Sequence, residues 1–423
     1  MALGQKRKQH AVGTAAELLA AAADPEIRQI AITTDLRELP TIRLSPGQSL
    51  TGGDDHPALC FANNQDGLQL SADNRVESLR LVVDPSRRAL FNDTSVQHLG
   101  CLTLRDLRVV GAVRLLASDR VRGGHVEAHA IEVEAADARG YDVRPKGYGV
   151  EVVPGAFTLW NQQADPTVTI TADLTGLAAG RPGAPVRGSG IFVSGAGDDG
   201  GRLLVSRLET GPVHSDGGIP PGTPDRISGG VFTVHGTFVD RVCNRDLVTT
   251  YGANDMVLDN WGTVDHWSAE AKITSHGPSG IGFVNFGTVN QLDVNALIET
   301  FGQGARGFNV YTGTVGAATF ERVVTHADGA VGIQISQPVG RIAVRRGIET
   351  FGATGDSLVK GVVVKLPAIG LSVKPGGSAQ RVEIAGGLIT HGRGVAPIEL
   401  HGSVAEMLIT GGFAALGGEF DPI

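Results

Sequence analysis

The pentapeptide IETFG stands at residues 298–302 and again at residues 348–352. A degenerate version recurs around both copies: an apolar residue, then Thr or Ser two positions later, then an aromatic ring or His, and usually Gly. The Thr or Ser falls at positions 250, 275, 300, 325 and 350, a constant spacing of 25, and again at 210 and 390 after gaps of 40. A fixed period of this length is typical of stacked structural repeats.

One repeat, residues 277–300, reads GPSGIGFVNFGTVNQLDVNALIET. Its apolar alternation indicates three short strands, at 282–286, 289–295 and 297–300. Three such strands joined by Gly corners leave no room for hairpins within one period, but they can form one turn of a coil. Stacked coils pair in parallel about 4.8 Å apart. The spacing therefore predicts an all-β fold, a single-stranded parallel β-helix with coils of about 25 residues.

Stacking brings equivalent positions into columns. We expect the Thr and Ser positions to face inward, with their hydroxyl groups hydrogen-bonded to one another along the stack. Asn260 and Asn285 are also 25 residues apart, and their amides should form a second internal ladder. The hydroxyl column contains Thr210, Thr250, Ser275, Thr300, Thr325, Thr350 and Thr390.

The N-terminal region predicts a cap for the first coil. Thr14 and Glu17 have the spacing of a capping box, followed by an Ala-rich helix over residues 14–23. A helix there would protect an open sheet edge. We therefore divide the chain into a basic tail (1–13), one β-helix domain (14–417) and a C-terminal tail (418–423).

The helix, the text TIRLSPGQSLTGG at 41–53 and the Gly-punctuated coils resemble the right-handed parallel β-helix proteins of the pectin-lyase-like superfamily. The resemblance covers about residues 14–417 and implies a right-handed coil. It also implies a set of activities that includes lyases, glycoside hydrolases, epimerases, fructotransferases and tailspikes. The acidic motifs of polygalacturonases are absent apart from GGDDHP at 52–57, and the pectate-lyase and alginate-epimerase motifs are missing. No family's catalytic residues can be transferred to this chain.

Composition narrows the class of protein. The net charge of −8 disfavours a nucleic-acid partner, and no run of 18 apolar residues predicts a membrane span. The start, MALGQKRKQH, is basic without a following apolar core, so we expect no secretory signal and a cytoplasmic location. Cys60, Cys101 and Cys243 are too far apart in the sequence to suggest a disulfide framework or a metal site.

Three columns should face outward. Aromatic rings beside carboxylates and amides suit a sugar-binding surface, although the same rings could stabilise the stack or pack against a partner chain. The first column is His235, Trp261, Phe286, Tyr311, Ser336, Lys374 and His401; the second is Thr233, Asp259, Val284, Asn309, Gln334, Ser372 and Glu399; the third is Tyr251, His276, Phe301, His326, Phe351 and His391.

Two insertions, at about 211–230 and 352–368, fall at the same corner of the coil. They would form the walls of a cleft, with the coils between them as its floor. The residues expected to bind substrate are His214, Asp225, Trp261, His276, Asn285, Arg306, Asn309 and Tyr311. Glycoside cleavage needs two carboxyl groups about 5–9 Å apart, and the candidates are Asp255, Asp259 and Asp216. Each Asp could instead cap backbone amides at a corner.

Three functions remain open. The first is a glycoside hydrolase or an intramolecular transglycosidase that acts on a neutral oligosaccharide, because Lys and Arg are sparse on the floor. The second is a non-enzymatic assembly or adhesion module, and the third is a lyase or an epimerase. We expect a homo-oligomer, with a trimer favoured. No cofactor or metal is expected, since His276, His326 and His391 are separated by Phe residues in their column.

Overall fold

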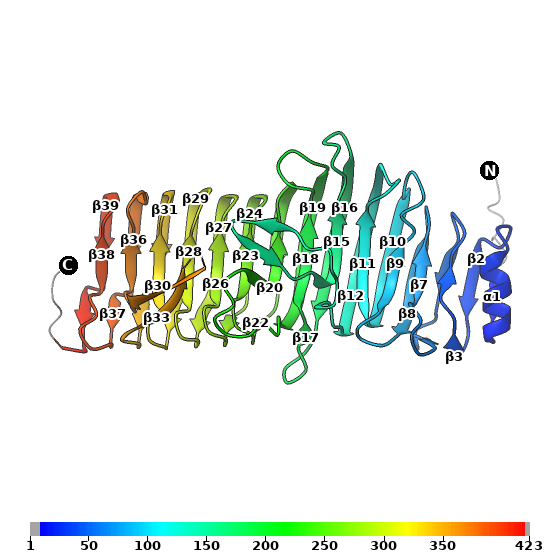
Figure 1. Ribbon diagram of the computed structural model, residues 1–423, viewed down its shortest axis with the longest axis horizontal. Helices are drawn as coiled ribbons and strands as arrows, with labels where there is room; N and C mark the ends of the chain where they lie inside the picture. The colour runs from blue at the N-terminus through cyan, green and yellow to red at the C-terminus, as the bar shows by residue number, and fades with distance from the viewer. Residues whose placement is uncertain (1–8, 360, 419–423) are drawn as a thin grey trace, which may run out of the picture.

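The computed structural model describes residues 9–359 and 361–418. They are 58% strand and 2% helix. Most strands belong to two long sheets of 23 and 15 strands, whose pairings are parallel apart from a short β13–β14 hairpin (Figure 1). The chain passes from the 15-stranded sheet to the 23-stranded sheet and back in each coil, and this confirms the prediction of an all-β parallel fold. Residues 1–8 and 419–423 of the two expected tails lie outside the described residues.

The 15-stranded sheet contains β4 (Ile42–Arg43), β7 (Leu68–Leu70), β9 (Arg88–Asn92), β11 (Ala112–Ala117), β13 (Lys146–Gly147), β14 (Val150–Val152), β15 (Gly155–Asn161), β18 (Ser189–Ser194), β20 (Arg226–Thr233), β23 (Asp255–Asn260), β26 (Ile281–Asn285), β28 (Arg306–Val310), β30 (Val331–Ile335), β35 (Leu371–Val373) and β38 (Ile398–Leu400).

The 23-stranded sheet contains β1 (His10–Val12), β2 (Gln29–Ile32), β3 (Leu36–Leu39), β5 (Ser49–Thr51), β6 (Ala58–Phe61), β8 (Arg75–Val82), β10 (Cys101–Val110), β12 (Gly123–Ala135), β16 (Thr169–Ala179), β17 (Val186–Arg187), β19 (Arg202–Asp216), β21 (Thr237–Asn244), β22 (Val248–Thr250), β24 (Thr263–Ala269), β25 (Ile273–Ser275), β27 (Thr288–Thr300), β29 (Thr314–Thr325), β31 (Pro338–Val344), β32 (Ile348–Thr350), β36 (Ser378–Ile384), β37 (Leu388–Thr390), β39 (Ser403–Ile409) and β40 (Phe413–Ala415).

The register of the sheets follows the sequence repeat. Val248 pairs with Ile273, Ile273 with Ile298, Ile298 with Val323, and Val323 with Ile348. The two IETFG copies therefore occupy one column, two coils apart. The step from β32 to β37 is longer because a separate antiparallel hairpin, β33 (Thr354–Val359) and β34 (Val362–Pro367), is inserted between them.

The first three letters of IETFG divide between the two faces of the strand. Ile298 and Thr300 point into the coil and are fully buried. Glu299 points outward, where it forms ion pairs with Lys272 of the preceding coil and with His326 of the next, whose Nε2 lies 2.8 Å from a Glu299 oxygen. The glutamate thus connects three successive coils across the outer surface.

The last two letters form the corner. The ring of Phe301 is stacked between those of His276 and His326, with centroids 5.1 and 4.5 Å away. Gly302 follows because the backbone of the preceding coil is too close for a side chain: a Cβ would lie 1.8 Å from the carbonyl oxygen of Gly277. The motif therefore forms a corner of the coil, where the ring stacks on the outside and the backbones of two adjacent coils are in close contact.

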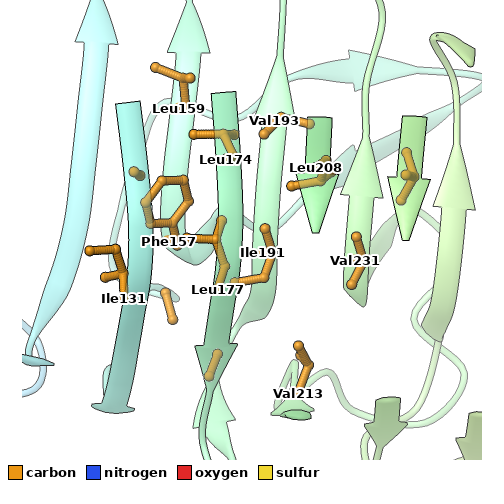
Figure 2. Close-up of a cluster of buried hydrophobic side chains, with 14 of the residues drawn as sticks. Ile131, Phe157, Leu159, Leu174, Leu177, Ile191, Val193, Leu208, Val213 and Val231 are labelled. Atoms are coloured by element: carbon orange, nitrogen blue, oxygen red, sulfur yellow. The ribbon is translucent and has the colours of Figure 1, made fainter. Parts of the chain in front are cut away.

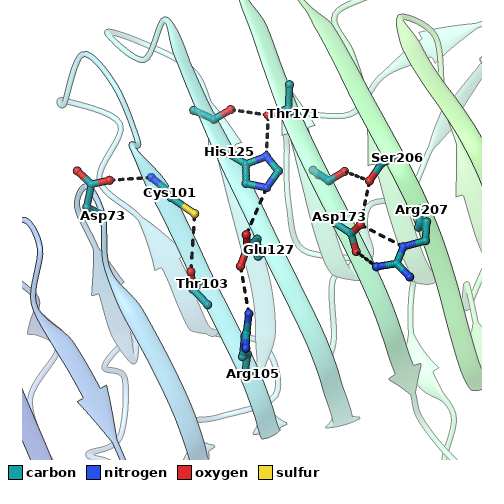
Figure 3. A network of polar contacts seen from close by, with 12 residues as sticks. Asp73, Cys101, Thr103, Arg105, His125, Glu127, Thr171, Asp173, Ser206 and Arg207 are labelled. Atoms are coloured by element: carbon teal, nitrogen blue, oxygen red, sulfur yellow. Dashed lines mark hydrogen bonds and ion pairs between the residues drawn. The ribbon is translucent and has the colours of Figure 1, made fainter.

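The interior is filled by aliphatic and aromatic side chains from both sheets. Phe157, Leu174, Leu177 and Ile191 pack there with no more than 1% of their surface exposed (Figure 2). The outer face of the 23-stranded sheet is polar instead, and its contacts cross from coil to coil (Figure 3). One example is His125, whose Nδ1 is 2.7 Å from the hydroxyl group of Thr171.

The prediction of a hydroxyl ladder inside the coil is wrong. Thr325 and Thr390 donate to backbone carbonyls within their own corners, and Thr250 and Ser275 have no partner among the described residues. The reason is reach: a hydroxyl group sits one bond from Cβ and cannot span the roughly 4.8 Å between coils with a normal hydrogen bond.

The register also corrects the start of this column. Ser215, and not Thr210, pairs with Thr250. The second outward column likewise begins with Phe232, which pairs with Asp259 in place of Thr233.

The amide ladder is confirmed, since an Asn side chain is longer. Asn260 Nδ2 donates to Asn285 Oδ1 at 2.9 Å, and the Thr233 hydroxyl group donates to Asn260 Oδ1 at 2.7 Å. All three residues are fully buried.

Helix α1 (Ala15–Ala23) closes the N-terminal end of the coil stack (Figure 1). Its predicted capping box is present: the Glu17 amide donates to the Thr14 hydroxyl oxygen, and the Glu17 carboxylate accepts from the Thr14 amide at 3.0 Å. Leu18 faces the first coil and is fully buried. Part of the expected N-terminal tail is strand β1, which pairs with β2. The described residues include no helix that is long and apolar enough to cross a membrane.

The corner geometry predicts the effect of a single methyl group. Gly302→Ala should lower the free energy of unfolding by roughly 1–3 kcal/mol, because the backbone of Gly277 must move to admit a Cβ. Gly53→Ala is the matched control, since its Cβ would meet nothing within 4 Å, and it should shift stability by less than about 1 kcal/mol. Urea unfolding of both variants measures the difference; equal midpoints would contradict the close approach.

Candidate functional site

Three segments cross the outer face of the 15-stranded sheet (Figure 1). The first is residues 139–152, which carry β13 and β14; β14 pairs in parallel with β20, two coils further along the stack than the adjacent β15. The second is the loop 217–225, and the third is the β33–β34 hairpin. The segment 211–230 is thus strand at both ends and loop only in its middle. The 139–152 segment was not predicted, although its length between β12 and β15 exceeds that of a normal corner.

The covered face is apolar. Phe232, Met256, Trp261, Ile281 and Val284 point outward from their strands, yet each is at most 8% exposed because the three segments lie over them. An outward-facing strand surface is normally polar, as on the other sheet. This second apolar cluster marks the part of the stack where the chain folds back on itself.

A cavity of about 70 Å³ lies within this covered face. Its floor includes Ile281, Val284 and Arg306 from adjacent coils, and its sides include Pro224 of the loop and Leu358 of the hairpin. This is the place between the two insertions where the sequence predicted a cleft.

A second cavity, of about 490 Å³, is more polar and lies on the other side of Tyr148. Its lining includes Lys146, Gln162, Ser194 and His235. The 139–152 segment separates the two cavities, because Lys146 lines the polar one while Tyr148 lines the apolar one.

Tyr148 occupies a central position on the first outward column. Its ring is 5.2 Å from His235, 5.1 Å from Trp261 and 4.6 Å from Phe286, measured between centroids. Trp261 and Tyr311, both expected to bind sugar, are consequently only 3% and 8% exposed. The aromatic column is therefore packed largely against its own chain.

Asp255 has the bonding pattern of a structural residue. Its carboxyl group contacts the Ser228 hydroxyl group and accepts from the backbone amides of Gly217 at 3.1 Å and Gly252 at 2.8 Å. It is fully buried, and burial raises its pKa to about 6 despite these hydrogen bonds. Asp255 thus fastens the start of the 217–225 loop to the corner of the next coil.

Asp259 is as deeply buried as Asp255 but lacks its hydrogen bonds. Neither of its carboxyl oxygens has a hydrogen-bond partner among the described residues, and the side chain is fully buried on the covered outer face. Burial raises its pKa well above the ordinary value. The Trp261 N–H opposes this shift, but no hydrogen bond of normal geometry joins the two groups.

Asn309 repeats this anomaly two coils along the same column. Both polar atoms of its amide lack a partner, and it is fully buried. Val284 pairs with Asp259 on one side and Asn309 on the other, and Val284 lines the apolar cavity. Two unsatisfied polar groups therefore flank the floor of the cavity, about 9.6 Å apart at one strand spacing per coil.

Asp216 lies near Asp255 rather than near Asp259. Both carboxyl groups lie beside Gly252: a Cβ added there would be 2.7 Å from an oxygen of Asp216 and 2.7 Å from an oxygen of Asp255. Asp216 is ion-paired with Arg187, and its charge contributes to the raised pKa of Asp255. Asp255 and Asp259 are four residues apart on one strand, which separates them by about 13 Å and exceeds the spacing for glycoside cleavage.

The remaining predicted residues are dispersed. Asp225 is exposed on the 217–225 loop, and Asn285 lies inside the coil in the amide ladder. His214 is buried and its Nδ1 is 3.1 Å from the Tyr251 hydroxyl group; burial lowers the pKa of this histidine. His276 is exposed at the corner. Arg306, Asn309 and Tyr311 are brought together on and beside β28.

The rings at the corner do not form a sugar platform. Tyr251, His276, Phe301, His326 and Phe351 are stacked one on another with interplanar angles of 4–11°. Because each face is covered by the next ring, only the edges reach the solvent, whereas a pyranose would stack on a face. This column stabilises the stack.

Comparison with known proteins found no relative: no family model, curated protein or solved structure matches the chain. Within the part of the chain that the structure describes, no three His, Cys, Asp or Glu side chains are grouped in a way that could hold a metal ion.

The raised pKa of Asp255 predicts a pH dependence of stability. Its folded pKa of about 6 exceeds the ordinary 3.8, so the folded state holds this proton more tightly, and stability falls as pH rises between these values. Asp255→Asn keeps the shape and removes the titration. Relative to wild type, its free energy of unfolding should rise by roughly 3 kcal/mol from well below pH 3.8 to well above pH 6, with about two-thirds of the change between these values. Parallel pH profiles from urea unfolding would contradict this assignment.

Proposed function

We propose that the protein is a carbohydrate-active enzyme, a glycoside hydrolase or an intramolecular transglycosidase, with Asp259 as its general acid. The observation that carries the proposal is the unsatisfied Asp259 carboxyl group. A buried structural carboxyl group is hydrogen-bonded, as Asp255 is, because leaving it unpaired costs free energy. An unpaired one on the covered face suits a proton donor, because burial raises its pKa and so favours the protonated form.

The polar cavity suits the saccharide better than the apolar one. Sugar hydroxyl groups need hydrogen-bond partners, and Lys146, Gln162 and Ser194 supply them there. The Gln162 Nε2 is buried without a partner among the described residues. A neutral oligosaccharide would extend from this cavity toward Asp259 and displace the side chain of Tyr148, which is 44% exposed and lies over the aromatic column.

Cleavage needs a second carboxylate, and we assign it to Asp198. This residue is exposed on the loop after β18, next to Gly197 of the polar cavity. Burial raises the pKa of the Tyr148 hydroxyl group, and the charges of Asp198 and Asp259 raise it further. Asp259 would protonate the leaving oxygen as the glycosidic bond breaks. Asp198 would take the proton of the attacking hydroxyl group, which belongs to water in hydrolysis or to the same sugar in anhydride formation.

We also propose that the coil is right-handed. The superfamily resemblance supports a right-handed coil, and the register, in which Ile273 and Ile298 are paired, supports a coil of about 25 residues.

The enzyme proposal predicts separate effects on activity and stability. Asp259→Asn should reduce turnover of a cleaved oligosaccharide by about 10²–10⁴-fold, because the proton donor is lost. It should leave the free energy of unfolding unchanged or higher, since no hydrogen bond is removed. Product masses from a panel of neutral oligosaccharides would follow the reaction.

Asp198→Asn serves as the test of the second carboxylate, and Glu406→Gln, at an exposed ion pair on the other sheet, serves as the control. Full activity of Asp259→Asn on a substrate that the wild type cleaves would refute the acid assignment. Failure of the wild type to bind or cleave any saccharide would refute the enzyme proposal as a whole.

An assembly function is the second candidate because of the last coil. Leu400, Phe413 and Leu416 are 49%, 66% and 62% exposed there, while helix α1 covers the opposite end. Exposed apolar side chains on unpaired edge strands favour association between chains.

This candidate predicts self-association through the C-terminal coil. Light scattering should show an oligomer, a trimer in our expectation, that dissociates when Phe413→Ser and Leu416→Ser are combined. Val362→Ser with Val363→Ser, on the exposed hairpin, is the matched control and should leave the mass unchanged. A monomeric wild type at high concentration would exclude this function.

A further inference from the structure

Arg306 is a buried cation beside the apolar cavity. It begins β28, lies in the same row as Met256 and Ile281 on the covered face, and is 1% exposed. Its side chain contributes to the cavity lining. The site proposed above for an oligosaccharide does not use it.

The partners of Arg306 are all neutral. Nη2 donates to the Ser357 hydroxyl oxygen at 2.9 Å, and longer contacts of 3.4 Å reach the Gly304 carbonyl and the Gln334 side chain. None of the ion pairs among the described residues includes Arg306. A guanidinium group has five N–H donors, and these three contacts use one each on Nε, Nη1 and Nη2. Donors therefore remain available for a ligand.

An unpaired buried cation is costly, because nothing compensates for the loss of its hydration. Elsewhere the chain avoids this cost: Arg187 is paired with Asp216, and buried Arg114 lies 3.9 Å from the centre of the Tyr141 ring. The ring nearest Arg306 is that of Tyr311, at 6.0 Å, which is the limit of useful cation–π attraction. Arg306 therefore has neither the counter-charge of the partly exposed Arg187 nor the close ring of the buried Arg114.

A second group at the same place is unsatisfied. Asn309 is three residues along the strand, on the same outward face, and neither atom of its amide has a partner. The cavity is lined by Arg306 on the same strand, by Tyr311 just after that strand, and by Val284 on the neighbouring strand. One cation and one amide are thus available beside an empty space whose other walls include Ile281, Phe286 and Leu358.

We propose that this cavity binds an organic monoanion, with a carboxylate paired to Arg306 and a flat apolar body packed against Val284 and Phe286. A guanidinium group matches a carboxylate through two parallel N–H bonds, which become strong where water is excluded. The apolar walls recognise the body of the ligand, because they offer few partners for hydroxyl groups.

This inference goes beyond the proposed enzyme function. It assigns a ligand to the apolar cavity, while the oligosaccharide lies on the Lys146 side of Tyr148. Binding of the anion does not depend on turnover of a sugar, so the two proposals can fail separately.

The test compares two ligands of the same shape. Binding of 3-phenylpropionate and of 3-phenylpropan-1-ol to the full chain is measured by calorimetry at constant ionic strength. The wild type should bind the carboxylate at least about tenfold more tightly than the alcohol, as expected for a charge-assisted pair. Equal affinities, or no binding of either ligand, would overturn the proposal whether or not an oligosaccharide is cleaved.

Variants then locate the pairing. Arg306→Met should abolish the preference for the carboxylate, and Arg306→Lys should retain part of it. Lys365→Gln, on the covering hairpin, removes the same charge without touching Arg306 and should keep the full preference. A preference that survives in Arg306→Met would overturn the assignment. Arg306→Met also loses the hydrogen bond to Ser357 and could fail to fold for that reason. In that case, the affinities of wild type and Arg306→Lys for the carboxylate and the alcohol test the proposal.

Discussion

The spacing between parallel coils, about 4.8 Å, is the constraint on which the rest of the structure depends. It places equivalent side chains at one short, fixed separation along the whole stack. Aromatic rings meet this distance by stacking, as Phe301 does with His326, and amides meet it by hydrogen bonding, as Asn260 does with Asn285. Hydroxyl groups are too short to bond to one another across it; Thr325 donates to a backbone carbonyl of its own corner, and Thr233 donates to the longer side chain of Asn260. Glycine is required at corners where backbones come closer still, as at Gly302.

The same spacing makes departures from the pattern informative. Where the outer face is solvated, charged side chains form pairs between coils, as Glu299 does with Lys272. Where residues 139–152, the 217–225 loop and the β33–β34 hairpin cover the face, apolar residues replace charges, and a few polar groups remain without partners. Asp255 and Asp259 show the contrast on a single strand: one is tied into the backbone of a corner, and the other is buried with nothing bound to it.

The two proposals divide the covered face at Tyr148. On its polar side, a proton donor and hydrogen-bonding side chains suit a saccharide, with Asp198 as the second carboxylate. On its apolar side, Arg306 lines the cavity without a counter-charge, and Asn309 beside it has no hydrogen-bond partner among the described residues, which suits an apolar anion. Both arguments rest on the cost of burying a polar group unpaired, and neither rests on similarity to a known protein.

The sequence by itself determined the parallel coil, the capping box at Thr14 and Glu17, the amide ladder and the cleft between two insertions. These features depend on residues whose spacing repeats or whose partners are close in the chain, so periodicity reveals them. Only the tertiary structure decided what happens on the covered face. Tyr148 donates its hydroxyl hydrogen to the carbonyl of Phe286, 138 residues away, and no local pattern encodes that contact. For that reason the sequence could nominate Asp255 and Asp259 equally, whereas their different surroundings, set by chain segments folded over distant coils, separate a structural carboxyl group from a candidate catalytic one.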